Sequence, residues 1–405
     1  MKHQRRSLSR HVVSPILGIL VLAGTVVAIA ALGPDNGNDA AGRANTSEPL
    51  ALAGGGQEKD TAKKPATQDG RVDAAKVMGF GKCVDCHANP GKAGHKLETS
   101  AWMKSKHFKT EEILGTTKAA AYAEAMGISK ASLRVDSMCV SCHATVQSNA
   151  AGKAVAVSGV SCESCHGGAS DWLNQHGSYG PKGTKREAET EKNREKRIAN
   201  CRKAGMIRTD DLYGLARNCF GCHVISNQDL VNKTTHQARS EFELVGKTYG
   251  ERHNLFMDGT KNAAAPSLWS NPVGKPARSA KNRQRVKFIV GVLVDLEFAM
   301  RNLSRVPAAA GNTGFAKRNK SNAKDKRELL EGICEILGDN LPPELAEAYE
   351  ACDAVKISFV AFKDTAGAKK AASKLAESAK MVSQKRDGSK LAALDELISD
   401  VVILK

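Results

Sequence analysis

Large apolar residues recur with helical spacing in the last third of this 405-residue chain. Between residues 283 and 305 they follow one another at intervals of three and four residues, the spacing of a helix face that is buried. These residues are Val286, Ile289, Val290, Leu293, Leu296, Met300 and Leu303. Asp295 and Glu297 interrupt the stretch, so it predicts a core helix and not a membrane span.

Further helices are predicted on both sides of a clear stop signal. Residues 327–338 end in Gly338, which suits a helix C-cap, and a Leu-Pro-Pro sequence begins the next segment. The stretches 364–384 and 387–403 predict two more helices. We therefore expect a helical C-terminal domain over residues 266–405 that covers the preceding domain or a partner.

The N-terminus has the pattern of an export signal. Four basic residues precede an apolar run from Val12 to Leu32, which contains Ala28-Ile29-Ala30 as a candidate cleavage site. The basic residues are Lys2, Arg5, Arg6 and Arg10. The run is long enough to span a bilayer, so residues 1–33 are either a signal peptide or an N-terminal membrane anchor. Both alternatives predict an exported protein that is periplasmic, soluble or tethered to the inner membrane.

Residues 34–75 are rich in Gly, Ala, Pro, Asp, Lys and Thr and show no apolar periodicity. This composition predicts a flexible linker. The formal charge of the chain is +17, but its basic residues are scattered singly, with no long Lys/Arg block and no basic helix with interleaved aromatic residues. We therefore expect no nucleic-acid partner.

The pentapeptide Cys-x-x-Cys-His occurs four times and contains eight of the eleven cysteines. In this order the four boxes read CVDCH, CVSCH, CESCH and CFGCH. Their cysteines are Cys83, Cys86, Cys139, Cys142, Cys162, Cys165, Cys219 and Cys222, and their histidines are His87, His143, His166 and His223.

Such a box is typical of covalent c-type haem attachment. Two thiols at this separation form thioethers with the two haem vinyl groups, and the adjacent histidine is then placed as an axial ligand of the iron. Disulfides, zinc knuckles or a thioredoxin-like redox pair would leave the four box histidines unexplained. The sequence therefore predicts four c-type haems.

Aromatic residues make up only 4% of the chain. Four porphyrins would replace them as the core of one domain. We therefore predict a mainly α-helical protein, in which residues 76–265 form short helices and loops wrapped around four haems, with little sheet. The helical bundle follows this tetrahaem domain.

Five further histidines lie outside the export segment and are candidates for the opposite side of the irons. His107, His176, His236 and His253 lie near the boxes or in segments with apolar patterning, and we predict them as distal ligands. His95 lies in a Gly/Pro-rich stretch that is typical of an exposed loop.

The boxes and their surroundings resemble the tetrahaem cytochrome c five-fifty-four family. The resemblance rests on the order of the boxes, on WMKSKH after the first, and on GVSCESCHGGASDW around the third, and it covers residues 78–255. It implies that His107 and His176 are distal ligands. It also implies that the haem held by Cys139, Cys142 and His143 is five-coordinate.

Two functions follow from these expectations. Closely spaced haems with two histidine ligands would make the protein an electron carrier between periplasmic or membrane-associated redox partners. An open iron would instead make it a multihaem oxidoreductase acting on a small nitrogen or sulfur compound, and a docking role of the C-terminal bundle is the third alternative. Four haems would leave the protein basic, so an acidic redox partner is expected.

Overall fold

The computed structural model describes residues 72–88, 98–185, 188–246, 279–358 and 360–401. The predicted export segment and nearly all of the predicted linker lie outside these ranges. The described chain is mainly α-helical, as predicted, with one small sheet.

The part before residue 247 consists of short elements. A two-stranded antiparallel sheet pairs β1 with β2, and an irregularity in its register lies between Thr145 and Val146. The elements are η1 Ala74–Lys76, α1 Gly81–His87, α2 Glu98–Met103, η2 His107–Gly115, α3 Thr117–Ala125, α4 Lys130–Leu133, α5 Val140–His143, β1 Thr145–Ser148, β2 Ala154–Ser158, α6 Cys162–His166, α7 Leu173–His176, α8 Glu191–Lys203, α9 Leu212–His223 and α10 Gln228–Lys233.

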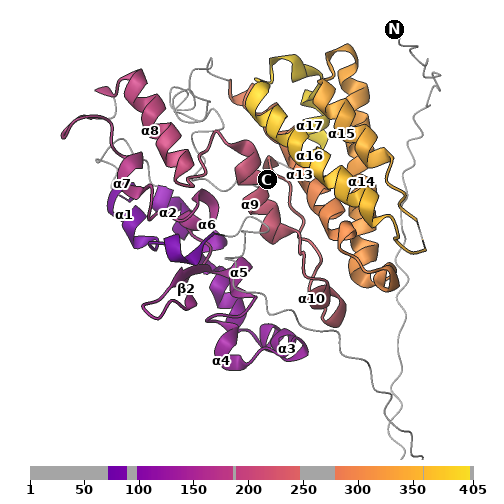
Figure 1. Ribbon diagram of the computed structural model, residues 1–405, viewed down its shortest axis with the longest axis horizontal. Coiled ribbons are helices and arrows are strands. Elements are labelled where there is room, and N and C mark those ends of the chain that lie inside the picture. Colours follow the sequence, from indigo (N-terminus) through magenta and orange to yellow (C-terminus); the bar gives the residue numbers. More distant parts are fainter. Residues whose placement is uncertain (1–71, 89–97, 186–187, 247–278, 359, 402–405) are drawn as a thin grey trace, which may run out of the picture. The chain divides into compact units, whose positions relative to one another are not determined.

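The part after residue 278 consists of longer helices, which lie beside one another in the orange to yellow region of Figure 1. Side chains cap the N-termini of three of them, since the side-chain oxygens of Ser279, Thr313 and Asp364 each accept a backbone N–H. The elements are α13 Ala280–Ser304, η5 Ala308–Ala310, α14 Gly314–Leu337, η6 Gly338–Asn340, α15 Pro343–Asp353, α16 Thr365–Lys385, η7 Ser389–Leu394 and α17 Asp395–Val401.

Helix α13 is the centre of this bundle. It contacts α14 and α16 and is buried along almost its whole length, including the seven residues that define its apolar pattern. Two buried carboxylates on it are paired. Glu297 accepts a hydrogen bond from Arg301 at 2.7 Å, and Asp295 accepts one from Arg239 at 2.8 Å.

The helix that carries the fourth box shares the core of the bundle. Helix α9 packs against α13, and Leu212, Ala216 and Phe220 belong to the same apolar cluster as Leu293 and Leu296. The fourth box and the bundle are therefore joined by one apolar cluster.

The cysteines outside the boxes have ordinary packing roles. Cys201 is fully buried and packs with Ala169 and Trp172. Cys334 and Cys352 lie on adjacent helices, α14 and α15, and both are unpaired thiols.

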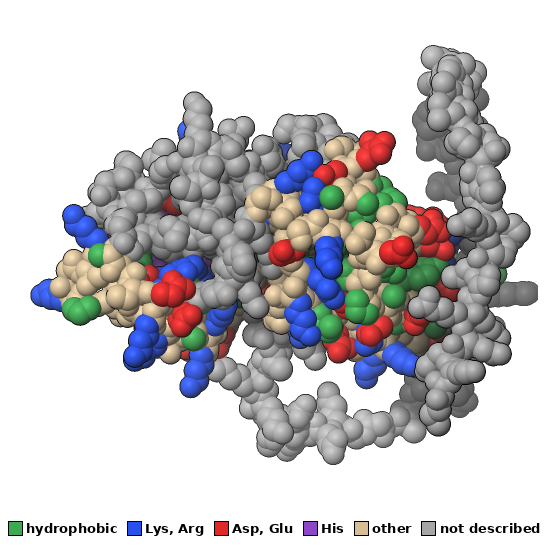
Figure 2. All heavy atoms as spheres, turned by 90° about the horizontal axis from the view of Figure 1, so that it is seen from above, with side chains coloured by type: hydrophobic (Ala, Val, Ile, Leu, Met, Phe, Trp, Pro, Cys, Tyr) green, Lys and Arg blue, Asp and Glu red, His purple; other side chains and the backbone are tan. Residues whose placement is uncertain are grey.

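On the face shown in Figure 2, basic and acidic side chains are interspersed over the described residues. Among the described helices, none has the length and apolar character needed to span a bilayer.

Candidate functional site

Each box ends a helix. The box histidines His87, His143, His166 and His223 are the last residues of α1, α5, α6 and α9. Residues three and four positions apart lie on one side of a helix, so this conformation turns both thiols and the imidazole of a box to the same side. Two of these helices begin at side-chain caps: Asp211 accepts the N–H of Gly214 at 2.9 Å in α9, and Ser161 and Ser164 form a capping box in α6.

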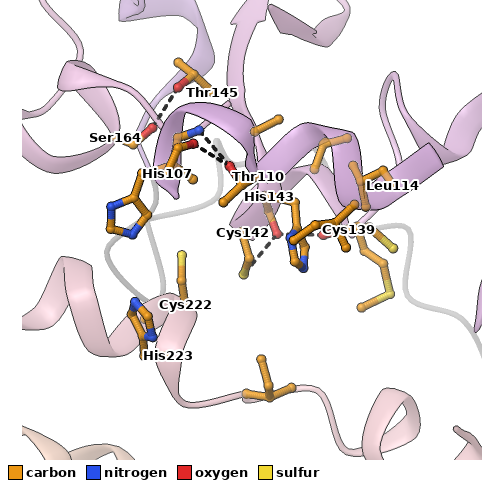
Figure 3. Close-up of a pocket in the computed structure, with 18 of the residues that line it drawn as sticks. His107, Thr110, Leu114, Cys139, Cys142, His143, Thr145, Ser164, Cys222 and His223 are labelled. Atoms are coloured by element: carbon orange, nitrogen blue, oxygen red, sulfur yellow. Dashed lines mark hydrogen bonds between the residues drawn. The ribbon is translucent and has the colours of Figure 1, made fainter. Parts of the chain in front are cut away.

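The second and fourth boxes line one cavity of 1620 Å³. Figure 3 shows Cys142 and His143 from α5 on one side of it, and Cys222 and His223 from α9 on another. His107 and His236 also line it, as does Cys165 from the third box. Cavities for a single small molecule measure about 300–1,000 Å³, so this one has room for a larger group.

His107 and His223 form the first of two histidine pairs. Their ring centroids are 6.2 Å apart and their planes are inclined by 76°. The pKa of His223 falls to about 4 because the site is buried and because His107 is close. The Nδ1 atom of His223 lies 2.6 Å from the hydroxyl oxygen of Ser240.

The segment that carries His107 is fixed by Gly159 and Val160, which lie between β2 and the third box. Thr110 donates a hydrogen bond to the carbonyl oxygen of His107 at 2.8 Å and accepts the N–H of Val160 at 3.1 Å. The Trp102 indole donates to the Val160 carbonyl oxygen at 2.8 Å. A Cβ at Gly159 would lie 2.6 Å from the His107 carbonyl oxygen, so only glycine permits this approach.

His87 and His176 form the second pair. Their ring centroids lie 6.3 Å apart and their planes are nearly parallel, inclined by 10°. The ring of Trp172 meets His176 edge-on at 5.4 Å, and the His176 Nδ1 contacts the carbonyl oxygen of Leu173. Arg197 donates to the His176 carbonyl oxygen at 2.8 Å and thereby holds the end of α7.

These two centroid distances match the distance expected between two imidazoles that bind the same metal from opposite sides. With a metal–nitrogen bond of about 2 Å and about 1 Å from nitrogen to ring centre, two imidazoles on opposite sides of a metal have centroids roughly 6 Å apart. Burial lowers the pKa of His143, His166 and His176 as well, which keeps the imidazoles neutral with a lone pair for a metal.

His236 lies in the same cavity as His143, and its charge lowers the pKa of His143 after the larger effect of burial. The His236 Nδ1 lies 2.8 Å from the carbonyl oxygen of Gln237, and its ring is 5.9 Å from that of Tyr122. An Nδ1–H donated to a carbonyl leaves Nε2 as the ligand atom, which is the usual arrangement of a metal-binding histidine. The Nδ1 atom of His143 is buried without a hydrogen-bond partner in the described part of the chain.

His166 is buried, and its Nδ1 lies 2.9 Å from the carbonyl oxygen of Ile207. His253 and His95 lie outside the described residues. Within the described ranges, no three Cys, His, Asp or Glu side chains converge on one metal ion.

The residues present fit c-type haem. Each box presents its thiols and imidazole from one helix end, two imidazole pairs have the separation of axial ligands, and a cavity of 1620 Å³ joins two boxes. Residues 82–167 match the family of cytochrome c554 and c-prime. This match confirms the resemblance over these residues, about a fifth of the chain, and supports a c-type cytochrome with covalently bound haem.

The family match is shorter than the predicted resemblance. It includes the first three boxes and His107 but ends before His176 and the fourth box. No curated protein and no solved structure matches the chain significantly.

Two residues of the site escaped the sequence analysis. Arg197 holds His176, and Glu163, inside the third box, binds the segment before the first. A charged residue between the two cysteines of a box was a visible signal, but its partners lie about eighty positions earlier in the chain.

Proposed function

We propose that this protein is a c-type cytochrome with four haems and that it carries electrons. The observation that carries the proposal is the pair of separations, 6.3 Å between His87 and His176 and 6.2 Å between His107 and His223. A haem iron with two histidine ligands has no position for a substrate, and it exchanges single electrons without binding one.

The arrangement of the boxes supports transfer between haems. The second and fourth boxes line the same cavity, and the thiols of Cys83 and Cys162, in the first and third boxes, are close enough to perturb each other's pKa. Four haems held in this way would form two neighbouring pairs.

His236 is the proposed sixth ligand at the second box. It shares the cavity with His143 and carries the Nδ1 contact to a backbone carbonyl that is typical of a ligand. This assignment departs from the five-coordinate second haem that the family resemblance implies. The remaining predicted distal ligand is His253. We propose that it is the sixth ligand of the iron at the third box, opposite His166.

The proposed carrier acts in the periplasm, as a soluble protein or tethered by its N-terminal segment. Removal of that segment's four basic residues would lower the formal charge from +17 to about +13, which the propionates of four haems would reduce further without reversing it. We propose an acidic redox partner, whose reduction rate should fall as ionic strength rises.

The test uses carbon monoxide on the reduced protein, followed by its absorption spectrum. If the protein is an electron carrier with two histidines on each iron, carbon monoxide should not change the spectrum of the wild type. After His236→Ala, one haem in four should bind carbon monoxide. Tyr122→Phe is the matched control, because it keeps the ring beside His236 and removes only the hydroxyl. Stoichiometric carbon monoxide binding by the wild type would contradict the carrier.

That result would favour the second candidate function. A multihaem oxidoreductase would bind a small nitrogen or sulfur compound at the second haem, and the cavity beside His143 would admit it. In that case the second haem of the wild-type ferric protein would give a high-spin signal.

A further inference from the structure

Glu163 lies between the two cysteines of the third box and is completely buried. Its carboxylate accepts three backbone N–H groups, from Met78 at 2.8 Å, from Gly79 at 2.8 Å and from Ala169 at 2.9 Å. An ionised carboxylate accepts hydrogen bonds and donates none, so this set of donors matches its charged form.

Two of these donors belong to the segment that leads into the first box. Met78 and Gly79 lie just before α1, which carries Cys83 and His87. The thiol of Cys83 is in turn next to that of Cys162, the residue before Glu163. One carboxylate therefore ties the first box to the third.

The glycines after the third box permit this contact. Gly167 has φ +87°, and a Cβ on Gly168 would lie 2.6 Å from the Cβ of Lys76. The next residues continue the contact, because the N–H of Ser170 donates to the Lys76 carbonyl oxygen at 3.0 Å. The sequence CESCHGGAS is thus a docking surface for residues 76–79.

We propose that Glu163 is a positioning residue and a fixed negative charge for the first and third haems. Its hydrogen bonds set the distance between the two boxes, and its charge stabilises the oxidised state of both irons, which lowers their reduction potentials. The inference rests on the proposed function, since it requires haems at both boxes.

The experiment compares Glu163→Gln with Asp171→Asn in the full haem-loaded protein. Glutamine keeps the shape of the side chain, loses its charge and cannot accept all three N–H groups. Asp171 is the matched control, because it belongs to the same sequence stretch and its carboxylate is half-exposed in an ion pair with Lys76. The readouts are the covalent haem count, a spectroscopic redox titration, and amide hydrogen exchange over residues 76–80.

We expect Glu163→Gln to keep four haems, to raise the potentials of two of them, and to speed exchange over residues 76–80 at least tenfold, while Asp171→Asn resembles the wild type. Unchanged potentials or unchanged exchange in Glu163→Gln would overturn the inference. If Glu163→Gln loses haem, the variant Glu163→Asp distinguishes the outcomes. Retention of haem in Glu163→Asp would support the need for a negative charge at this position. Loss of haem in both variants would overturn the inference. Fewer than four haems in the wild type would instead contradict the proposed function itself.

Discussion

His87 and His176 lie with nearly parallel imidazole rings, 6.3 Å between centroids and 10° between planes, although they come from helices that are far apart in the sequence. The arrangement places a box histidine opposite a histidine that belongs to no box. It supports the proposal that His176 binds the iron of the haem at the first box, a pairing that no spacing in the sequence contains.

Replacement of His176 by alanine is expected to open that haem. The first haem would keep its thioethers and His87, so the covalent haem count would stay at four, while one iron in four would become high-spin in the ferric protein. Electron paramagnetic resonance and carbon monoxide binding measure the change. Gln175→Ala, at the exposed neighbouring position, should leave both signals as in the wild type. A His176→Ala protein with only low-spin haem would show that the pair is not an axial pair.

Arg197 is expected to hold His176 in position through the backbone of that residue. Its guanidinium holds the His176 carbonyl oxygen and forms two hydrogen bonds with Glu189, at 2.7 and 2.6 Å, with both side chains 3% exposed. Arg197→Ala would leave the Glu189 charge buried and unpaired, at a cost of about 3–5 kcal/mol in the free energy of unfolding.

Denaturant unfolding of the Arg197→Ala protein measures that cost. The double variant Arg197→Met with Glu189→Gln should lose less, because it leaves no buried charge without a partner. Loss of Arg197 should also loosen His176. We therefore expect the haem at the first box to bind carbon monoxide in part of the Arg197→Ala molecules. Equal stability of the single variant and the wild type would contradict this role.

The sequence predicts most accurately what depends on local spacing. The four boxes follow from residues at most four positions apart, and helix α13 follows from an apolar period that the structure reproduces. The first half of α14 was missed because polar residues take positions on its buried face. Asn319 accepts a hydrogen bond from Asn302 at 2.9 Å, and Asn322 donates one to Asp295 at 3.0 Å.

Features that depend on contacts between distant segments were not predictable in this way. The pairing of His107 with His223 and the partners of Glu163 require the fold, as does the packing of α9 on α13. The sequence predicted a tetrahaem domain over residues 76–265 and a helical domain over residues 266–405, which covers the first domain or a partner. The apolar pattern of α9 and α13 does not tell which surface each helix packs against. Their contact in the fold shows that they share one core.

Glu344 and Arg386 are expected to clamp α15 to the end of α16. The buried carboxylate of Glu344 accepts two hydrogen bonds at 2.6 Å from Arg386, and these outweigh the effect of burial and lower the pKa of Glu344. A carboxyl group with a lowered pKa in the folded state stabilises the fold above its unfolded pKa of about 4.3, and this contribution is lost as the pH falls.

Glu344→Gln should therefore reduce the free energy of unfolding by about 1–3 kcal/mol at pH 7 and flatten its fall below about pH 4.5. Denaturant titrations at several pH values, followed by circular dichroism, measure both effects. Glu347, on the same helix as Glu344, forms an exposed ion pair with Lys374 of α16, so Glu347→Gln should cost less than about 1 kcal/mol. An equal loss in both variants would show that burial of the Glu344 pair is unimportant.

The covalent haem count tests the central claim most directly. Protein produced with a haem-attachment system is denatured, extracted with acidified solvent, and examined by the pyridine haemochrome spectrum and by intact mass. The account predicts four haems per chain that resist extraction and a mass increased by four haem groups. A colourless chain with the mass of the bare polypeptide would contradict it.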